Sequence, residues 1–398
     1  MERLGEAKHE DKITLAHLQL LPLITGVQTV TLEEFSSLDR TKFSPVLICK
    51  EEGPLTAAME DEGIVSHYVN DLVRPISPLR DWKAFRQLLL QLRSLSPHIL
   101  HTHSSKTGLL GRVAAWIAGV PVVVHTVHGF AFPFATSRFA RAIYYWVEFV
   151  GARFCDGLIV LNESDRRTTI EKLKVPKGKV HLIPNGVRLA GMGRSEEPKR
   201  SEIRRKSFAA DENTVCIGMV GRLWRQKNPG CLLEAAKKVF KTTNKSVKFF
   251  IIGDGELREE LEQVIAVESL QDQVVLLGWR TDVAHLLSAL DVFVLPSRWE
   301  GMPLAILEAM ASTLAVVVSD IPGNNDLVKN EQDGLLFASE NDQQLSEQLL
   351  RLINDASLRE TLANAAHQKV VANYQLESRN QRVFELYDEL LAKKLSKA

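Results

Sequence analysis

The sequence predicts an α/β protein of two domains, each built on a parallel β-sheet. Short β-branched runs alternate with longer segments of helical periodicity, a pattern typical of repeated β-α-β units. The 398 residues also exceed what one hydrophobic core usually supports. A polar stretch rich in Arg and Lys interrupts the alternation once, at residues 187–213, and a new apolar run follows it. We therefore expect two separate windings of the chain.

The predicted strands are short apolar runs, and helical periodicity separates most of them. In the first half they are Ile13–Leu18, Pro45–Cys49, Ile64–Tyr68, Ile99–Thr102, Val122–Thr126, Gly157–Leu161 and Val180–Ile183. In the second half they are Val215–Val220, Lys248–Ile252, Val274–Leu277, Val292–Leu295, Ala315–Ser319 and Gly334–Phe337. After Asn341 only helical periodicity remains, and it ends in the amphipathic stretch Glu377–Leu391.

These patterns predict two Rossmann-like domains and a terminal helix. The first domain covers residues 1–190, a linker covers 191–213, and the second domain covers 214–373. We expect the C-terminal helix, 374–398, to pack back toward the first domain. Ligands of such folds bind beyond the carboxyl ends of the strands, so functional motifs are sought directly after strands.

Composition excludes several classes of protein. Lys plus Arg and Asp plus Glu both number 49, so no overall basic field points to nucleic acid. The four cysteines lie far apart without a C-x-x-C pair, which argues against a zinc knuckle or a disulfide framework. The N-terminus lacks an apolar signal segment, and no long uncharged apolar run occurs. A cytoplasmic protein is predicted.

The loop after the predicted strand Val215–Val220 has the features of a phosphate site. It carries Arg222 and Lys227, and an apolar helical pattern follows. Asn228 suits the N-cap of that helix and Pro229 its first position. Both cations would then lie near a positive helix end, which favours a diphosphate. The alternative interpretation is a pair of solvated surface cations.

A second loop of the same design follows the predicted strand Val292–Leu295. Glu300 and Gly301 precede Pro303, which marks the first turn of another apolar helix. Gly301 permits close approach of the backbone to a ligand. The backbone N–H groups of Gly301, Met302 and Leu304 are candidates for bonding sugar or phosphate oxygens.

Glu308 lies more than one turn inside this second helix. Its neighbours in sequence are apolar, so the helix is predicted to be largely buried. A lone buried carboxylate is costly without partners, which favours a ligand over an ordinary helix glutamate. A carboxylate can accept hydrogen bonds from two vicinal hydroxyls.

Together these residues resemble the retaining glycosyltransferases of family 4, which have the GT-B fold, in which two Rossmann-like domains with parallel sheets face a central cleft. The resemblance covers nearly the whole chain, and E-x7-E with G-R-x4-K upstream is its specific part. The matching motifs are the loop Leu20–Val27, HTHSSKTGLLGR at His101–Arg112, VHTVHGFAF at Val124–Phe132, PNGV at Pro184–Val187, VGRLWRQKN, IIGDGEL at Ile251–Leu257, and Glu300 to Glu308.

The resemblance implies roles for individual residues of the second domain, which would hold the activated sugar. Arg222 and Lys227 would neutralise the donor diphosphate, and Glu308 would bind the ribose hydroxyls. Glu300 would contact the transferred sugar. Arg280 falls where such enzymes bind the base, largely through backbone atoms.

The first domain would hold the acceptor. His128 matches a histidine that faces the reacting sugar, and His103, Ser104 and Lys106 fall on the acceptor side. Gly26 lies in the loop that covers the phosphates, although ITGVQT departs here from the commoner double-glycine form.

The function implied is a retaining, metal-independent glycosyl transfer that needs no cofactor. The donor is a nucleotide-sugar, with UDP favoured and GDP the alternative. The acceptor is a saccharide or a lipid-linked saccharide of bacterial surface polysaccharide synthesis. A sugar-nucleotide epimerase and a catalytically silent sugar-nucleotide-binding protein remain alternatives. A nicotinamide-dependent dehydrogenase is disfavoured because LPLITGVQT lacks G-x-G-x-x-G.

Three further features suggest other functions. His101, His103, His125 and His128 invite a metal site, but no carboxylate or cysteine constellation accompanies them in sequence, so none is predicted. Asp254-Gly255-Glu256 is better explained as a tight turn before a helix than as a metal triplet. The segment Phe130–Phe154 is aromatic and contains arginines. It is either a peripheral contact with the inner face of the cytoplasmic membrane or a core-packed helix.

Overall fold

The computed structural model describes residues 12–135 and 137–396. The chain forms two compact units, which are described separately. The first comprises residues up to Ile183 together with the C-terminal residues from Asn380, and the second comprises Pro184–Arg379. The C-terminal helix α15 (Leu376–Leu395) thus begins in the second unit and contributes most of its length to the first.

The first unit is built on a parallel sheet with strand order β3-β2-β1-β4-β5-β6-β7. Every strand pairing in it is parallel, as the predicted β-α-β units require. The strands are β1 (Ile13–Leu18), β2 (Phe43–Cys49), β3 (Val65–Tyr68), β4 (Ile99–His103), β5 (Val122–Val127), β6 (Gly157–Val160) and β7 (Val180–Leu182).

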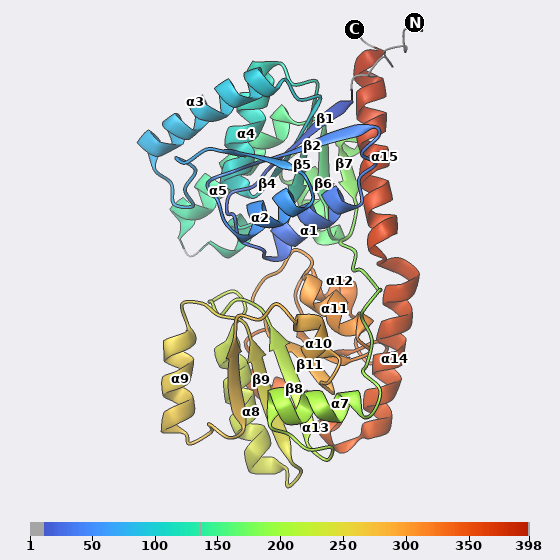
Figure 1. Cartoon of the computed structure of the whole chain (residues 1–398). Coiled ribbons are helices and arrows are strands. Elements are labelled where there is room, and N and C mark those ends of the chain that lie inside the picture. Colours follow the sequence, from blue (N-terminus) through green and yellow to red (C-terminus); the bar gives the residue numbers. More distant parts are fainter. Residues whose placement is uncertain (1–11, 136, 397–398) are drawn as a thin grey trace, which may run out of the picture. The chain divides into compact units, whose positions relative to one another are not determined.

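Helices cover both faces of this sheet. α3 and α4 pack on one face through Ala84, Leu88 and Ala114, which join the core formed with Leu18 and Leu100. α15 lies along the unit near β7, where Arg382 donates a hydrogen bond to the backbone oxygen of Leu182 at 2.6 Å (Figure 1). The helices are α1 (Gly26–Ser36), α2 (Pro54–Asp61), α3 (Pro78–Leu95), α4 (Ser105–Ala118), α5 (Arg138–Gly151), α6 (Glu163–Glu171) and the short turns η1 (Phe132–Phe134), η2 (Ala152–Phe154) and η3 (Lys177–Lys179).

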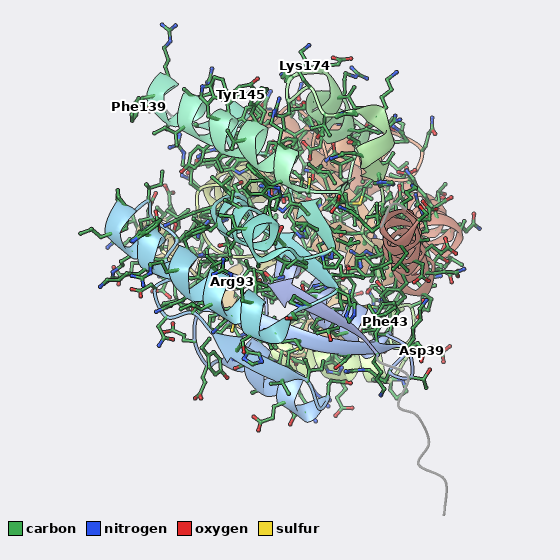
Figure 2. The ribbon with its side chains drawn as sticks, turned by 90° about the horizontal axis from the view of Figure 1, so that it is seen from above. Asp39, Phe43, Arg93, Phe139, Tyr145 and Lys174 are labelled. Carbon is green, nitrogen blue, oxygen red and sulfur yellow. The ribbon has the colours of Figure 1, made fainter. Side chains whose placement is uncertain are left out.

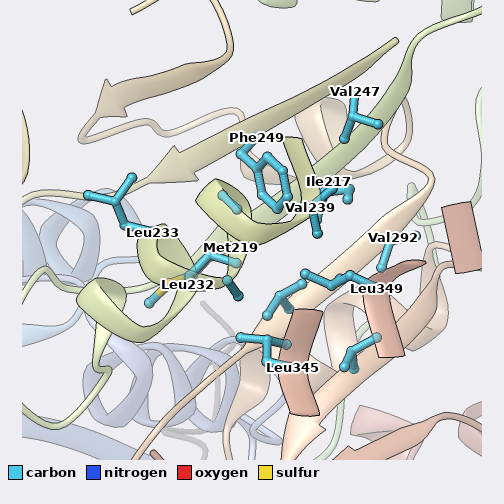
Figure 3. Packing of buried hydrophobic residues seen from close by; sticks show 14 of the residues in the cluster. Ile217, Met219, Leu232, Leu233, Val239, Val247, Phe249, Val292, Leu345 and Leu349 are labelled. Carbon is cyan, nitrogen blue, oxygen red and sulfur yellow. The ribbon is translucent and has the colours of Figure 1, made fainter. Parts of the chain in front are cut away.

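The second unit has a parallel sheet with strand order β10-β9-β8-β11-β12-β13. One face packs on α8 and α13, where Leu232, Val239 and Leu345 meet Ile217 and Phe249 (Figure 3). The strands are β8 (Val215–Val220), β9 (Val247–Ile252), β10 (Val274–Gly278), β11 (Val292–Leu295), β12 (Ala315–Ser319) and β13 (Leu335–Phe337). The helices are α7 (Lys199–Ile203), η4 (Arg204–Phe208), α8 (Pro229–Thr242), α9 (Arg258–Val267), α10 (Val283–Leu287), α11 (Leu304–Ala311), α12 (Asn324–Leu327), α13 (Asp342–Asn354) and α14 (Ala356–Asn373).

The two parallel Rossmann-like sheets confirm the predicted fold class. All the predicted strands occur, with ends that shift by at most two residues. The helix starts are partly corrected. Pro229 is the first residue of α8 as expected, but Asn228 is left-handed, with φ 52°, and its side chain makes no capping bond. Pro303 precedes α11 rather than opening it, since the helix begins at Leu304.

The polar stretch that was predicted as a linker folds as part of the second unit. Arg200 and Arg204 each lie 2.6 Å from one carboxylate oxygen of Asp291, which immediately precedes β11. The backbone N–H of Cys216 donates to the same carboxylate at 2.8 Å. Arg204 and Asp291 are buried, so this ion cluster anchors α7 and η4 against the sheet.

In both sheets, chain order reverses beside the first strand. The reversal lies between β1 and β4 in the first unit and between β8 and β11 in the second. Ligands of open parallel sheets bind at such switch points, beyond the carboxyl ends of the strands. The two loops that the sequence singled out follow β8 and β11, so they meet at the switch point of the second unit.

The sequence predicts neither a membrane-spanning segment nor a disulfide framework. Among the described residues, no helix has the length and apolar content needed to cross a bilayer. All four cysteines, Cys49, Cys155, Cys216 and Cys231, are buried free thiols. Burial raises the pKa of the Cys216 thiol to about 12, so it is protonated at neutral pH.

Candidate functional site

Gln226 joins the loop after β8 to the loop after β11. Its side-chain amide donates to the backbone oxygen of Trp299 at 2.8 Å, and its own backbone oxygen accepts from the N–H of Arg298 at 2.8 Å. These two bonds run in opposite directions between the same pair of loops. The loops therefore form one rigid surface at the switch point.

Lys227 and Glu300 meet within this surface. The Lys227 ammonium lies 2.5 Å from Glu300 Oε1, and the hydroxyl of Ser297 donates to the same oxygen at 2.7 Å. Only 17% of the Lys227 side chain and 7% of the Glu300 side chain are exposed. Partial burial strengthens the attraction and holds both side chains in one conformation. The structure thus brings together the predicted phosphate cation and the predicted sugar acid.

Glycines let the neighbouring loops pack closely around this pair. A Cβ on Gly253, which follows β9 with φ 139°, would lie 2.0 Å from the backbone oxygen of Gly221. A Cβ on Gly323, which follows β12 with φ 88°, would lie 2.4 Å from the backbone oxygen of Gly301. Real Cβ atoms do not approach so closely, and both φ values favour glycine. The loops after β8 and β11 are therefore supported from both sides.

Arg222 and Arg280 are more exposed than Lys227 and already carry partners. Arg222 lies 3.1 Å from Glu256, and 44% of its side chain is exposed. It must exchange that carboxylate for a phosphate to act as predicted. Arg280 follows β10 and makes two 2.7 Å bonds to Asp282. Those bonds raise the pKa of Arg280 and lower the pKa of Asp282.

Glu308 lies on α11, and its carboxylate has no hydrogen-bond or ion-pair partner among residues 12–135 and 137–396. Its neighbours Leu307 and Ala309 are fully buried. Part of the Glu308 surface remains accessible, but the surrounding protein removes most of the hydration of its carboxylate. This desolvation raises the pKa of Glu308 above its ordinary value of 4.5.

We expect Glu308→Gln to stabilise the unliganded protein above pH 7. A carboxyl whose pKa is raised in the folded state favours folding while it is protonated, and that contribution is lost as the pH rises through its folded pKa. The gain of the variant should therefore vanish below about pH 4.5, where Glu308 is protonated in both states. Urea unfolding at several pH values measures it, with the exposed Glu259→Gln as the control. A variant less stable than wild type at pH 8 would contradict the assignment.

The loop after β11 is also anchored by Asn185 of the PNGV motif. The Asn185 amide donates to the backbone oxygen of Met302 at 2.8 Å. Met302 and Gly301 are buried, and Leu304 begins α11, so the Leu304 N–H has no intrahelical acceptor. Gly301, Met302 and Leu304 thus lie in one anchored turn, as the predicted backbone contacts require.

The predicted residues of the first unit gather beyond β4 and β5. His103 ends β4 and is fully buried, and its Nδ1 lies 3.0 Å from Nε2 of the half-buried His128. A buried His103 can affect an acceptor only through His128. Ser104 has φ 65° and precedes α4, and Gly26 opens α1.

Lys106 has a structural role in this unit. Its ammonium donates to the backbone oxygens of Val73 and Pro75 and pairs with Asp81 at 2.5 Å. These contacts hold the segment before α3 against α4. Its acceptor-side role stays a prediction.

Sequence reasoning missed Gln226, Ser297 and Asn185. All three act by fixing backbone or carboxylate positions rather than by carrying charge. Asn185 and Gln226 each lie in a motif that marks this family, PNGV and VGRLWRQKN, whereas Ser297 lies in none of those motifs. His17, Glu34 and Tyr387 of the first unit were also missed, because nothing in their local sequence marks them.

The second unit thus contains one partly buried cation, Lys227, and two carboxylates, those of Glu300 and Glu308, which differ in hydration. It also contains backbone N–H groups in the turn that leads into α11. Such a set suits a ligand with an anionic part and several hydroxyls.

Comparisons with known proteins agree with this chemistry. The profile of the family described as "Glycosyl transferases group 1" matches residues 200–369, and that of "Glycosyltransferase Family 4" matches residues 24–190. The UDP-Gal:alpha-D-GlcNAc-diphosphoundecaprenol alpha-1,3-galactosyltransferase of Escherichia coli is 42% identical over 386 residues, which cover 96% of this chain and 98% of that protein.

More distant relatives extend the comparison. The N,N'-diacetylbacillosaminyl-diphospho-undecaprenol alpha-1,3-N-acetylgalactosaminyltransferase of Campylobacter jejuni is 28% identical and covers 79% of this chain and 83% of that protein. The crystal structure of HepE from Anabaena with UDP and glucose has a TM-score of 0.82 at 19% identity and covers 95% of this chain and 100% of that one. Sucrose-phosphate synthase from Thermosynechococcus elongatus has a TM-score of 0.77 at 18% identity, with 96% and 100% covered. The chain belongs to the family 4 glycosyltransferases of GT-B fold and is a glycosyltransferase.

Proposed function

We propose that this enzyme transfers galactose from UDP-galactose to the GlcNAc of a GlcNAc-diphosphoundecaprenol acceptor, with retention of configuration and without a metal ion. The observation that carries the proposal is 42% identity over almost the full length of an enzyme named for this reaction. UDP-galactose is α-linked and the product named for that relative is α-1,3-linked, so the same transfer here would retain configuration. The reaction suits bacterial surface polysaccharide synthesis.

The second unit supplies the donor contacts in this proposal. Lys227 and Arg222 neutralise the diphosphate, Glu308 accepts hydrogen bonds from the ribose hydroxyls, and Arg280 lies beside the base. Glu300 bonds the transferred sugar while it keeps Lys227 oriented at 2.5 Å. The ribose hydroxyls would give the Glu308 carboxylate the hydrogen bonds that it lacks within the described chain.

The transfer step then proceeds on one face of the sugar. The bond from the anomeric carbon to the phosphate oxygen breaks as the acceptor oxygen forms its bond from the same side. The proton of the acceptor hydroxyl passes to the departing phosphate, whose growing negative charge Lys227 and Arg222 stabilise. His128 of the first unit bonds a hydroxyl of the donor sugar.

The test is a transfer assay with purified enzyme and synthetic GlcNAc-diphospho-lipid. UDP-galactose is compared with UDP-GlcNAc, UDP-GalNAc and GDP-mannose, and the product linkage is read by NMR. We expect an α-1,3-galactosyl product from UDP-galactose alone, at the same rate with EDTA. A β-linked product, a rate abolished by EDTA, or preference for another donor would overturn the corresponding part of the proposal. An altered sugar nucleotide formed without acceptor would indicate an epimerase, and binding without turnover a silent protein.

A lipid-linked acceptor suggests that the enzyme touches a membrane, and one surface of the first unit fits this contact. α3, α4 and α5 pack side by side and leave large apolar side chains exposed, among them Trp82 at 61%, Trp116 at 65% and Trp146 at 56%. Phe139, 77% exposed, projects from α5 (Figure 2). The exposed basic residues of α3 and α5 are Arg80, Lys83, Arg86, Arg93, Arg138 and Arg141.

We infer that this aromatic and basic surface docks on an anionic bilayer. Phe139→Ser with Trp146→Ser should lower binding to phosphatidylglycerol vesicles at least tenfold, since each buried aromatic contributes about 1.5–3 kcal/mol. Vesicle co-sedimentation measures it, and Val267→Ser, which removes an 83% exposed side chain from α9 of the second unit, is the control. Equal binding of both variants, or equal binding to uncharged vesicles, would contradict the inference.

A further inference from the structure

A cluster of buried imidazoles lies at the switch point of the first unit. His17 on β1 is in register with His101 on β4, and His103 follows two residues later on the same face of the sheet. All three side chains are fully buried. Glu34 of α1 and Tyr387 of α15, both also buried, lie against this face of the sheet.

Consecutive contacts connect Glu34 to His128 through this cluster. Glu34 Oε2 lies 3.4 Å from His17 Nε2. The other nitrogen of His17, Nδ1, lies 3.2 Å from His103 Nε2. The other nitrogen of His103, Nδ1, lies 3.0 Å from His128 Nε2. Each imidazole in the series therefore uses one ring nitrogen toward each neighbour.

A neutral imidazole carries one proton, so such a series has a direction. The pKa of His103 is held well below its usual range, first by burial and then by its imidazole neighbours, so His103 is neutral at pH 7. The hydroxyl of Tyr387 lies 2.5 Å from His101 Nδ1 and 3.3 Å from His17 Nε2, so when its proton is directed to His101 its oxygen accepts from His17 Nε2–H. A carboxylate at Glu34, whose Oε2 lies 3.4 Å from the same nitrogen, favours the proton there through its charge. His17 Nδ1 then accepts from His103 Nε2–H, and His103 Nδ1 accepts from His128 Nε2–H.

We propose that Glu34, acting through His17 and His103, fixes the tautomer of His128 so that its Nδ1 is unprotonated and can only accept a hydrogen bond. Glu34, His17 and His103 are thus positioning residues. The contact of His128 with the donor sugar rests on the proposed function above, but the tautomer does not. An accepting Nδ1 would bond a sugar hydroxyl through its proton and leave that oxygen electron-rich.

The side branch of the cluster agrees with the same assignment. Tyr387 Oη lies 2.5 Å from His101 Nδ1 and 3.3 Å from His17 Nε2, and His101 Nε2 lies 2.7 Å from Thr126 Oγ1. With the tyrosine proton directed to His101 Nδ1, the His101 proton lies on Nε2 and is donated to Thr126. Thr31 Oγ1 lies 3.5 Å from both His17 Nδ1 and His103 Nε2, and as a hydroxyl it can accept from His103 Nε2–H and donate to His17 Nδ1, which is consistent with the same direction.

A metal ion held by His17, His101 and His103 is the competing explanation, because one nitrogen of each lies close enough to the others. The ring geometry does not favour it. His101 and His103 are stacked, with centroids 4.4 Å apart and an interplanar angle of 29°. Lone pairs of imidazole lie in the ring plane, so those of two stacked rings run nearly parallel instead of converging on one ion.

The direct test is histidine ¹⁵N NMR of the full chain, with the His128 signals assigned by their loss in His128→Gln. We expect His17, His101, His103 and His128 to be neutral Nε2–H tautomers in the wild-type enzyme. An Nδ1–H tautomer or a protonated ring at His103 or His128 would overturn the proposal. So would the binding of one equivalent of Zn²⁺ by the metal-free protein with shifts at His17, His101 and His103.

A variant tests the role of Glu34. In Glu34→Met the carboxylate charge beside His17 Nε2 is gone, so Tyr387 can donate to that nitrogen instead of to His101 Nδ1 and reverse the series, and we expect both tautomers of His128. The matched control is Glu148→Met, which removes another buried carboxylate of the same unit, 3.6 Å from Arg112. If Glu34→Met does not fold, the tautomers measured by NMR in the wild-type enzyme still test the proposal.

Kinetics separate this proposal from the proposed function. We expect Glu34→Met to lower kcat about tenfold while the KM for the donor stays within about twofold, because only the orientation of one hydrogen bond changes. Absence of transfer in the wild type would refute the proposed function and leave the tautomer result standing. An unchanged His128 tautomer in a folded Glu34→Met would refute the positioning role whatever the activity.

Discussion

Lys227→Ala is expected to lower the rate of glycosyl transfer about 10²- to 10³-fold. Lys227 is the one predicted phosphate cation that the structure holds in a partly buried site, 2.5 Å from Glu300. Removing a preorganised charge that stabilises a leaving group typically costs this much, because water cannot replace it in a desolvated site. UDP affinity should fall as well, since the diphosphate loses the same contact. Steady-state kinetics and calorimetric UDP titration measure the two effects.

The control is Lys237→Ala. Lys237 lies on α8 in the same unit and is also ion-paired, but its partners Glu234 and Glu268 are 46% and 42% exposed, whereas Glu300 is only 7% exposed. The Lys237→Ala variant should transfer the sugar at the wild-type rate. If Lys227→Ala retained wild-type kcat and UDP affinity, Lys227 would not lie at the donor diphosphate.

Asp291→Ala is expected to lower the free energy of unfolding by about 3–5 kcal/mol. Arg200 and Arg204 each contact one oxygen of this carboxylate at 2.6 Å, and the N–H of Cys216 donates to it. Arg204 is buried, so the substitution leaves an uncompensated charge in the interior and an amide without its acceptor. Urea unfolding followed by fluorescence measures the loss.

An exposed ion pair of the same unit sets the scale for this measurement. Asp342 lies 2.6 Å from Lys238, and the side chains of Asp342 and Lys238 are 35% and 38% exposed. Asp342→Ala should cost less than about 1 kcal/mol. Equal losses in the two variants would show that the Asp291 cluster does not anchor residues 194–208.

The central strands were predictable because they are buried on both faces of their sheets. Phe249 and Phe250 point to opposite faces of β9, and neither is exposed. Such strands read as continuous apolar runs, which local sequence reveals directly. The helix starts were harder. Asn228 was expected to cap α8 with its side chain, whereas its backbone is left-handed and its side chain makes no capping hydrogen bond.

Residues 194–208 show a limit of composition. A stretch rich in Arg, Lys and Glu resembles a solvated linker. The carboxylate that pairs with two of its arginines, Arg200 and Arg204, lies about 90 residues further along the chain. No local pattern marks Asp291 as their partner. Only the fold brings them together.

The two loops that carry Lys227 and Glu300 were predictable for a different reason. Each loop follows a strand directly and precedes a helix that begins at or next to a proline, and both features are visible in sequence. The residues that orient them were not visible, because Gln226 and Ser297 carry no charge. The series from Glu34 to His128 joins residues of α1, β1 and β4 with the residue that follows β5. Sequence singled out His103 and His128, but not His17, the carboxylate or the direction of the series.

A crystal structure of the enzyme with UDP tests most directly whether the loops after β8 and β11 hold the donor. We expect a diphosphate oxygen within hydrogen-bond distance of the Lys227 ammonium and both ribose hydroxyls on the Glu308 carboxylate. A nucleotide bound elsewhere, or one whose ribose leaves Glu308 without a contact, would contradict the assignment of this site.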